Sequence, residues 1–290
     1  MNVTLENNYL SISVKQKGAE LCRVYNKDTK LEYMWDADPA FWGKTSPVLF
    51  PIVGTLKEDT FVYDNKKYHV SRHGFARDLN FEIEDQKKDG AIFLLKSNAI
   101  TLEKYPFAFE LRLKYALQEN FISVTYDVKN VGNKEMYFSI GGHPAFRVPI
   151  VKEESFEDYY LEFNKLENAS RWPINAAGLI ENNPASLINN TNRVSLTRAL
   201  FLNDALVFKN LNSNMVSIKS KKTKHGLDFY FDKFPFLGIW SAKGANFVCI
   251  EPWCGIADSV DHSQQLVSKE GIEKIRSQET WLRSWKVKFY

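Results

Sequence analysis

The sequence lacks the features that mark secreted and membrane-spanning proteins. Its 290 residues include only three cysteines, Cys22, Cys249 and Cys254, and such an odd, low count does not suggest a disulfide framework. It has no run of about 18 consecutive apolar residues, as a transmembrane helix needs. Its N-terminus has no basic segment followed by an apolar one, so no signal peptide is expected. We therefore expect a cytoplasmic protein.

Signatures of nucleic-acid, nucleotide and metal binding are also missing. The 38 basic and 35 acidic residues give a formal charge of +3 and are spread along the chain, which predicts neither a nucleic-acid stripe nor a membrane patch. The sequence contains no GxGxxG, GxxxxGK[ST], HExxH or paired CxxC motif. His69 and His73 could share one face of a strand, but no nearby carboxylate or cysteine completes a metal site. We expect no cofactor and no metal ion.

Aromatic residues and apolar alternation are what the chain does have. Phe, Tyr and Trp make up 14% of it, and these residues favour strands and stack on sugar rings. Apolar residues at every second position predict half-buried antiparallel strands over residues 107–117 and 121–129, joined by a short hairpin loop. Further alternating or apolar runs predict strands at 9–14, 61–70, 93–95, 134–140, 247–250 and 285–290.

Helical signals are few. Residues 195–208 are predicted to carry a helical turn or two, and Ser268 to cap a short helix through Ile275, although Gly271 weakens it. Residues 164–194 are rich in Asn, Ala and Pro and are predicted to form a long loop. Many strands with few helices predict an all-β sandwich or barrel, and we expect residues 1–290 to form a single domain.

A first segment with chemical potential is residues 72–77 (RHGFAR). His73 precedes a glycine, where a ligand can approach the backbone closely, and Arg77 offers a fork of donors for a sugar hydroxyl or a phosphate. A surface histidine and an Arg77–Asp78 ion pair would explain the same residues without any function. This segment alone therefore leaves both interpretations open.

Two further segments each place a titratable residue before a proline. In residues 141–146 (GGHPAF), His143 precedes Pro144, and in residues 250–254 (IEPWC), Glu251 follows an apolar run and precedes Pro252. The prolines hold both backbones away from the helical conformation. Because charged groups are rarely buried without a partner or a purpose, Glu251 is a candidate functional residue. A structural histidine and a structural ion pair are the alternatives.

A histidine and a glutamate together can exchange the anomers of a sugar. One group takes the proton of the C1 hydroxyl while the other protonates the ring oxygen; the ring opens, the aldehyde rotates, and the roles reverse on closure. Their ordinary pKa values, about 6.5 for His and about 4.3 for Glu, can be moved toward the working pH by the surroundings. Such a reaction needs no metal, nucleotide or covalent intermediate.

Together, these segments resemble the aldose 1-epimerase family of the galactose mutarotase-like superfamily, and its LacX-like subgroup in particular. The similarity runs in order through most of the chain. Its motifs are residues 46–54 (SPVLFPIVG), 73–77 (HGFAR), 142–146 (GHPAF), 226–229 (GLDF), 237–241 (LGIWS) and 250–253 (IEPW).

The resemblance implies a large antiparallel β-sandwich with few short helices and a shallow sugar cleft. It also implies that His143 is the general acid at the ring oxygen, that Glu251 is the general base at C1, that His73 orients sugar oxygens, and that Asp228 binds hydroxyls. From aromatic stacking alone, we expect two aromatic residues in the cleft as well. The expected substrate-binding residues are then His73, Phe75, Arg77, Asp228 and Trp240.

One departure from the family bears on the substrate. Family members often carry an arginine that contacts the sugar shortly after the Phe-Pro element, whereas this chain reads GTLK over residues 54–57. Either Lys57 substitutes for that arginine with a less directional charge, or the contact is lost.

The main hypothesis is mutarotation of a free aldohexose. The alternatives are a hexose-6-phosphate 1-epimerase, for which Arg72, Arg77 and Lys57 offer positive charge, and a sugar-binding or sensing protein with weak or no catalysis. A glycoside hydrolase is disfavoured, because it usually needs two carboxylates. The expected partner is a small-molecule sugar, and the expected assembly is a monomer or homodimer.

Overall fold

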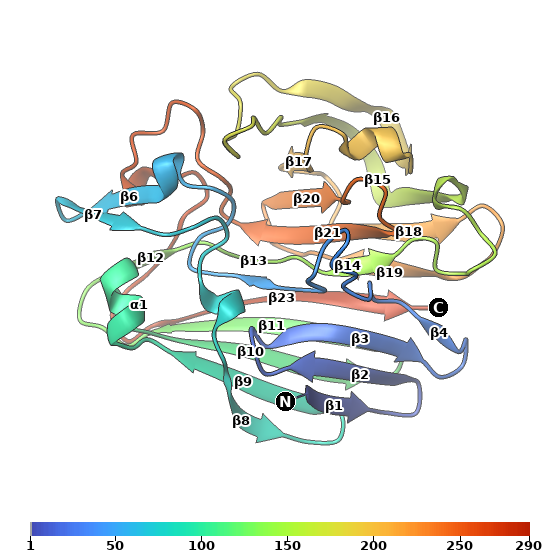
Figure 1. Ribbon diagram of the computed structural model, residues 1–290, viewed down its shortest axis with the longest axis horizontal. Helices are drawn as coiled ribbons and strands as arrows, with labels where there is room; N and C mark the ends of the chain where they lie inside the picture. Colours follow the sequence, from blue (N-terminus) through green and yellow to red (C-terminus); the bar gives the residue numbers. More distant parts are fainter. Residues whose placement is uncertain (1) are drawn as a thin grey trace.

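The computed structural model describes residues 2–290, most of them in antiparallel strands (Figure 1). One large sheet has nine strands. In spatial order they are β16 (Ala185–Ser195), β15 (Tyr159–Arg171), β18 (Met215–Ser220), β19 (Gly226–Tyr230), β23 (Thr280–Phe289), β11 (Phe121–Asn130), β10 (Phe109–Gln118), β9 (Gly90–Lys96) and β8 (Glu82–Gln86).

Two smaller sheets cover the inner face of this nine-stranded sheet. The four-stranded one is β1 (Asn2–Glu6), β2 (Leu10–Lys15), β3 (Glu20–Asn26) and β4 (Leu31–Glu32). The six-stranded one is β17 (Leu206–Lys209), β20 (Phe236–Trp240), β21 (Phe247–Cys254), β13 (Ile140–Gly142) and β5 (Val48–Leu49), with β14 (Ala145–Arg147) also paired to β21. Two short pairs complete the strands: β6 (Thr60–Tyr63) with β7 (Lys66–His69), and β12 (Met136–Phe138) with β22 (Glu273–Ile275).

Helices are few and short. The α-helix α1 (Ala99–Lys104) starts at a capping box between Asn98 and Thr101. The 3₁₀ turns are η1 (Lys57–Asp59), η2 (Ala76–Asp78), η3 (Phe156–Asp158), η4 (Arg198–Phe201) and η5 (Leu266–Ser268). Over residues 2–290, no helix is long and apolar enough to cross a membrane.

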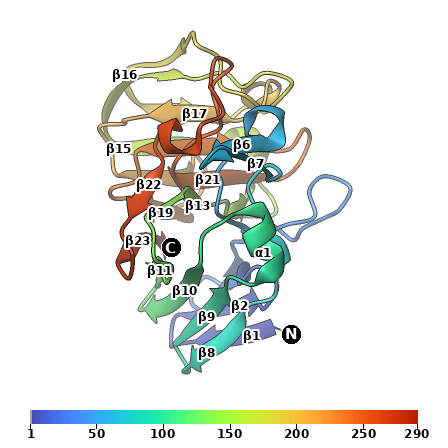
Figure 2. The same ribbon diagram turned by 90° about the vertical axis from the view of Figure 1, so that its left-hand side faces the viewer.

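A continuous apolar core joins the layers. Tyr115 of the large sheet donates a hydrogen bond to the carbonyl oxygen of Ala19 (2.7 Å), and the rings of Phe146 and Phe229 lie 6.0 Å apart between β14 and β19. The side view places β15 and β16 at one end of the molecule and β1 and β8 at the other (Figure 2). The prediction of a large antiparallel β-sandwich with few short helices is confirmed.

Strands with one buried face matched their predictions best. The hairpin of β10 and β11 is present, and because Gln118 pairs with Phe121 its turn contains only Glu119 and Asn120. The run 61–70 is not one strand but the β6–β7 hairpin, since Asp64 and Asn65 turn the chain with φ values of 50° and 59°.

Two local predictions were wrong. The segment 164–194 is not a long loop but largely the hairpin of β15 and β16, whose irregular register and exposed side chains hide the alternation. The predicted helix from Ser268 is absent: Gly271 has a φ of 70°, and β22 follows it. The helical turn predicted within residues 195–208 is present as η4, before β17 begins.

Strand β21 is buried on both faces. Val248, Ile250 and Cys254 belong to the main core, whereas Phe247 and Cys249 belong to an aromatic cluster on the opposite side. Side chains alternate along a strand, so residue 251 shares the face of Cys249 and points away from the main core. This alternation is what presents Glu251 to the space beyond the six-stranded sheet.

Candidate active site

A cavity of about 510 Å³ lies beside that second face of β21. Its walls come from parts of the chain that are far apart in sequence: the loop before β5, the segment before η2, the end of β13, the 172–184 segment, β20 and β21. Sequence-predicted residues in its lining are His73, Arg77, His143, Trp240 and Glu251.

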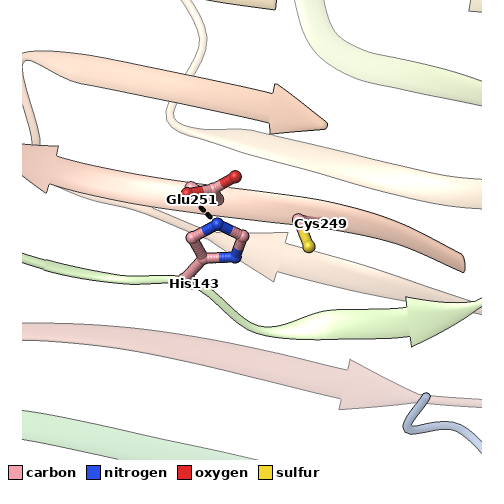
Figure 3. A group of neighbouring side chains, drawn as sticks. All are labelled: His143, Cys249 and Glu251. Atoms are coloured by element: carbon pink, nitrogen blue, oxygen red, sulfur yellow. Dashed lines mark ion pairs between the residues drawn. The ribbon is translucent and has the colours of Figure 1, made fainter. Parts of the chain in front are cut away.

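His143 and Glu251 meet in the wall of this cavity (Figure 3). The Nε2 atom of His143 lies 3.2 Å from Oε2 of Glu251, and the two residues are 8% and 1% exposed. This distance is that of an ion pair. The two groups are not aligned for a hydrogen bond, and Oε2 has no hydrogen-bond partner among the described residues. The structure therefore brings together the two residues that the sequence singled out.

Burial favours the uncharged form of both groups. It raises the pKa of Glu251 well above its ordinary value, with Arg72 offsetting part of the effect. It also lowers the pKa of His143 to about 3, although a backbone hydrogen bond opposes the shift. Both shifts favour a protonated Glu251 opposite a neutral His143 imidazole.

The neutral state of His143 has a measurable effect on stability. An unfolded histidine titrates near about pH 6.5, so between about pH 6.5 and 3 the unfolded chain binds more protons at this position. The neutral ring therefore adds to the free energy of unfolding above this pH range, and this contribution is lost as the pH falls through the range.

Replacing His143 tests this effect on stability. As the pH is lowered from about 7 to about 4, we expect the free energy of unfolding to fall less in His143→Asn than in the wild type, measured by urea denaturation. Equal losses would show that His143 is not held neutral.

Two tryptophans frame His143. The ring of Trp42 stacks on the imidazole with centroids 4.8 Å apart at 27°, and Trp240 meets the same imidazole edge-on at 5.6 Å. Both tryptophans line the cavity. Their flat faces suit the apolar C–H surface of a sugar ring, which leaves the hydroxyls free for polar partners.

His73 is buried and held in an unusual conformation. Its φ is 69°, in the left-handed region, and its neighbour Gly74 has a φ of 72°. The backbone N–H of Gly54 donates to Nδ1 of His73 (3.1 Å), and the Nε–H of Arg72 donates to Nε2 (3.3 Å). The ring centroid lies 5.8 Å from that of His143, so His73 stands beside the pair.

Gly74 is required for this conformation. A Cβ atom there would lie 2.2 Å from the carbonyl oxygen of Phe50, in addition to the strain of positive φ. We expect Gly74→Ala to lower the free energy of unfolding by about 2 kcal/mol or more in urea denaturation. Gly43→Ala is the matched control, since nothing lies within 4 Å of its added Cβ atom. Similar stabilities for the two variants would contradict this explanation.

The arginines of the first motif reach the cavity. Arg77 donates to the backbone carbonyl of Arg72 (2.8 Å) and lies 3.7 Å from the carboxylate of Asp78, so the Arg77–Asp78 ion pair exists alongside the cavity contact. Arg72 also lines the cavity, and its guanidinium lies 3.7 Å from the carboxylate of Asp204.

Two expected site residues lie elsewhere. Asp228 is on β19, where it accepts hydrogen bonds from Ser217 (2.6 Å) and Tyr290 (3.1 Å), and it does not line the cavity. Phe75 packs into the main core beside Phe109. Neither residue is brought to the cavity: alternation turns Asp228 away from its core-facing neighbours on β19, and Phe75 packs against the apolar core.

Lys57 does not take the place of the missing arginine. Its ammonium group donates to the carbonyl oxygen of Val260 (2.8 Å), and Lys57 does not line the cavity. The space beside Thr55 is occupied by Gly178, where an added Cβ atom would lie 2.4 Å from the Thr55 hydroxyl. Of residues 54–57, Gly54 alone lines the cavity.

Sequence reasoning missed Trp42 and Asp204. Trp42 stands in a polar loop, and its only signal was an aromatic pair, Phe41 and Trp42, in a segment of loop composition. Asp204 has a φ of 68° just before β17, but nothing in its neighbourhood distinguished it from a turn residue.

The antiparallel sandwich, with a His–Glu pair and tryptophans lining its cavity, fits a carbohydrate epimerase, and the comparisons with known proteins support that class. The family model of aldose 1-epimerase matches residues 1–267. The chain therefore belongs to the aldose 1-epimerase family.

Individual relatives are similar over nearly their full length. Protein LacX (plasmid) from Lactococcus lactis subsp. lactis is 34% identical over 298 residues, covering 99% of each chain. A galactose mutarotase related enzyme from Lactobacillus acidophilus is 36% identical with a TM-score of 0.96, covering 100% of this chain and 97% of its own. A galactose mutarotase-like protein from Lactobacillus casei is 30% identical with a TM-score of 0.94, covering 100% of both chains.

Proposed function

We propose that this epimerase interconverts the α and β anomers of a free aldohexose, with His143 as general acid at the ring oxygen and Glu251 as general base at C1. The observation that carries the proposal is the 3.2 Å contact between the two groups in the wall of a 510 Å³ cavity. The reaction needs one group that accepts a proton and one that donates a proton. Once the proton of Glu251 has passed to His143, the pair supplies both groups.

Because burial favours the protonated form of Glu251, the base must first be freed. The proton can cross the 3.2 Å contact to His143, which creates an ionised Glu251 and a protonated imidazole. Sugar hydroxyls entering the cavity stabilise both charges by hydrogen bonds. Glu251 then takes the C1 hydroxyl proton while His143 protonates the ring oxygen, and the roles reverse when the ring closes.

The test is anomer exchange measured by NMR with purified protein and candidate aldoses. We expect exchange between anomers faster than in buffer for at least one free hexose. Absence of acceleration for every free aldose and every 6-phosphate would overturn the proposal. Tight sugar binding in calorimetry without exchange would instead support a sugar-binding or sensing function.

Positive charge in the cavity favours a hexose 6-phosphate as the second candidate substrate. Arg72, Arg77 and Lys243 all line the cavity, and within residues 2–290 Lys243 forms no ion pair. A phosphate at C6 would give these cations a partner. For this substrate, kcat/KM would exceed that of the free hexose, and Lys243→Ala would lower only the value for the phosphate.

The stacked Trp42 should contribute to sugar binding. We expect Trp42→Ala to lower kcat/KM about two- to tenfold, the range for losing one aromatic stacking contact. Trp42→Phe keeps a flat ring at the same place and should recover most of the loss. Kinetics of anomer exchange for the three proteins provide the measurement, and an unchanged kcat/KM in Trp42→Ala would rule out sugar stacking on this ring.

A further inference from the structure

We propose that a thiophilic divalent cation, with Zn²⁺ as the best-fitting case, binds between His143, Cys249 and Glu251 and inhibits the epimerase. The inhibition rests on the proposed function, because the cation would occupy its acid–base pair. The binding itself does not, because it follows from the arrangement of three side chains.

The three ligand atoms already lie close together. Cys249 and Glu251 project from the same face of β21, and His143 approaches them from the segment between β13 and β14 (Figure 3). One ligand atom of each residue lies within 4.8 Å of the other two. Ligand atoms of a tetrahedral zinc ion stand roughly 3.3–3.7 Å apart, given bonds of about 2.0–2.3 Å. The His143–Glu251 separation of 3.2 Å nearly meets this requirement, and the thiol needs to move only roughly 1 Å.

An unsatisfied buried oxygen marks the same place. Within residues 2–290, Oε2 of Glu251 is buried and has no hydrogen-bond partner. Such orphaned atoms are uncommon in native proteins. No lysine or arginine of the described chain lies within ion-pair distance of Glu251; its only ion-pair contact is His143. The orphaned Oε2 is also the oxygen that faces His143.

The mixed donor set selects the class of metal. Imidazole nitrogen, thiolate sulfur and carboxylate oxygen together suit Zn²⁺, whereas Mg²⁺ and Ca²⁺ prefer oxygen alone. His143 and Glu251 line the cavity, which provides the entry path and leaves a fourth coordination position for water. On binding, the thiol proton and the carboxyl proton leave to solvent while the imidazole binds through its lone pair.

The chain provides a matched control for the cysteine. Cys254 lies on the same strand and is equally buried, but its side chain belongs to the main core on the opposite face. Cys254→Ala therefore removes a buried thiol from β21 without touching the proposed ligands. Cys249→Ala removes the sulfur ligand, and Cys249→Ser does so with nearly unchanged packing if the alanine variant folds poorly.

The binding test uses Co²⁺ added to the full-length protein as a spectroscopic probe for Zn²⁺. We expect sulfur-to-cobalt charge-transfer absorption in the wild type and in Cys254→Ala, its loss in both Cys249 variants, and its displacement by added Zn²⁺. No absorption in the wild type, or equal absorption in the Cys249 variants, overturns the site. This readout does not depend on activity, so it remains decisive even if no anomer exchange is found.

The inhibition test measures anomer exchange against Zn²⁺ concentration. We expect at least tenfold slower exchange at saturating Zn²⁺ in the wild type and in Cys254→Ala, with recovery on chelation. Loss of the sulfur ligand should raise the half-inhibiting Zn²⁺ concentration at least about tenfold in the Cys249 variants. Equal inhibition of all variants would place the inhibitory ion elsewhere and overturn the proposal. Cobalt absorption together with unimpaired exchange would refute inhibition.

Discussion

Replacing Glu251 by Gln is expected to slow anomer exchange about 10²- to 10⁴-fold, because the amide keeps the shape of the side chain but neither accepts nor releases the transferred proton. The measurement is kcat/KM from NMR exchange or polarimetry. Folding should not suffer. Burial raises the pKa of Glu251 in the folded protein. The wild type therefore loses stability as the pH rises from the ordinary pKa of a glutamate toward this raised pKa, whereas the neutral amide avoids this loss.

Asp228→Asn is the matched control for this variant. It makes the same carboxylate-to-amide change on a side chain that contacts Ser217 and Tyr290 outside the cavity. We expect nearly wild-type exchange for this variant. Full activity in Glu251→Gln would refute its role as base, and a large loss in Asp228→Asn would show that Asp228 takes part after all.

Replacing His143 by Asn should cause a loss of similar size, about 10²- to 10⁴-fold, because within residues 2–290 no other group hydrogen-bonds the Glu251 carboxyl oxygen that faces His143. Both residues handle the same proton, so their effects should not add. The double variant with Glu251→Gln should be about as slow as the slower single variant. Multiplied losses in the double variant would mean that the two residues act independently.

Secondary structure was predictable from the sequence where burial was one-sided. Residues of β10 and β11 alternate between core and solvent, so their pattern of apolar residues reports the strand directly. In β15 and β16 both faces are largely exposed beyond residue 163, so the same backbone geometry leaves no apolar pattern. The hairpin turn at Asp64 and Asn65 was hidden because apolar residues continue on both sides of it.

The site residues that lie in short sequence motifs could be predicted from the sequence. His143 and Glu251 each stand before a proline, and Glu251 also ends an apolar run; such local signals can be recognised without knowledge of the fold. Trp42 and Asp204 enter the cavity through tertiary assembly, and no short motif surrounds them. Asp228 lies within a family-like motif, but only the pairing of β18 with β19 reveals that it faces Ser217.

The cavity wall combines a strand that is buried on both faces, β21, with a partly exposed loop that carries Trp42. A strand covered on both sides opens to hydrogen exchange only with extensive unfolding, so Glu251 is preorganised on the most rigid kind of frame. Trp42 belongs instead to a loop in which Phe41 is 45% exposed. If the proposed reaction holds, we expect adaptation to sugars of different shape to fall to the aromatic wall, while the proton-transfer geometry stays the same from one sugar to the next.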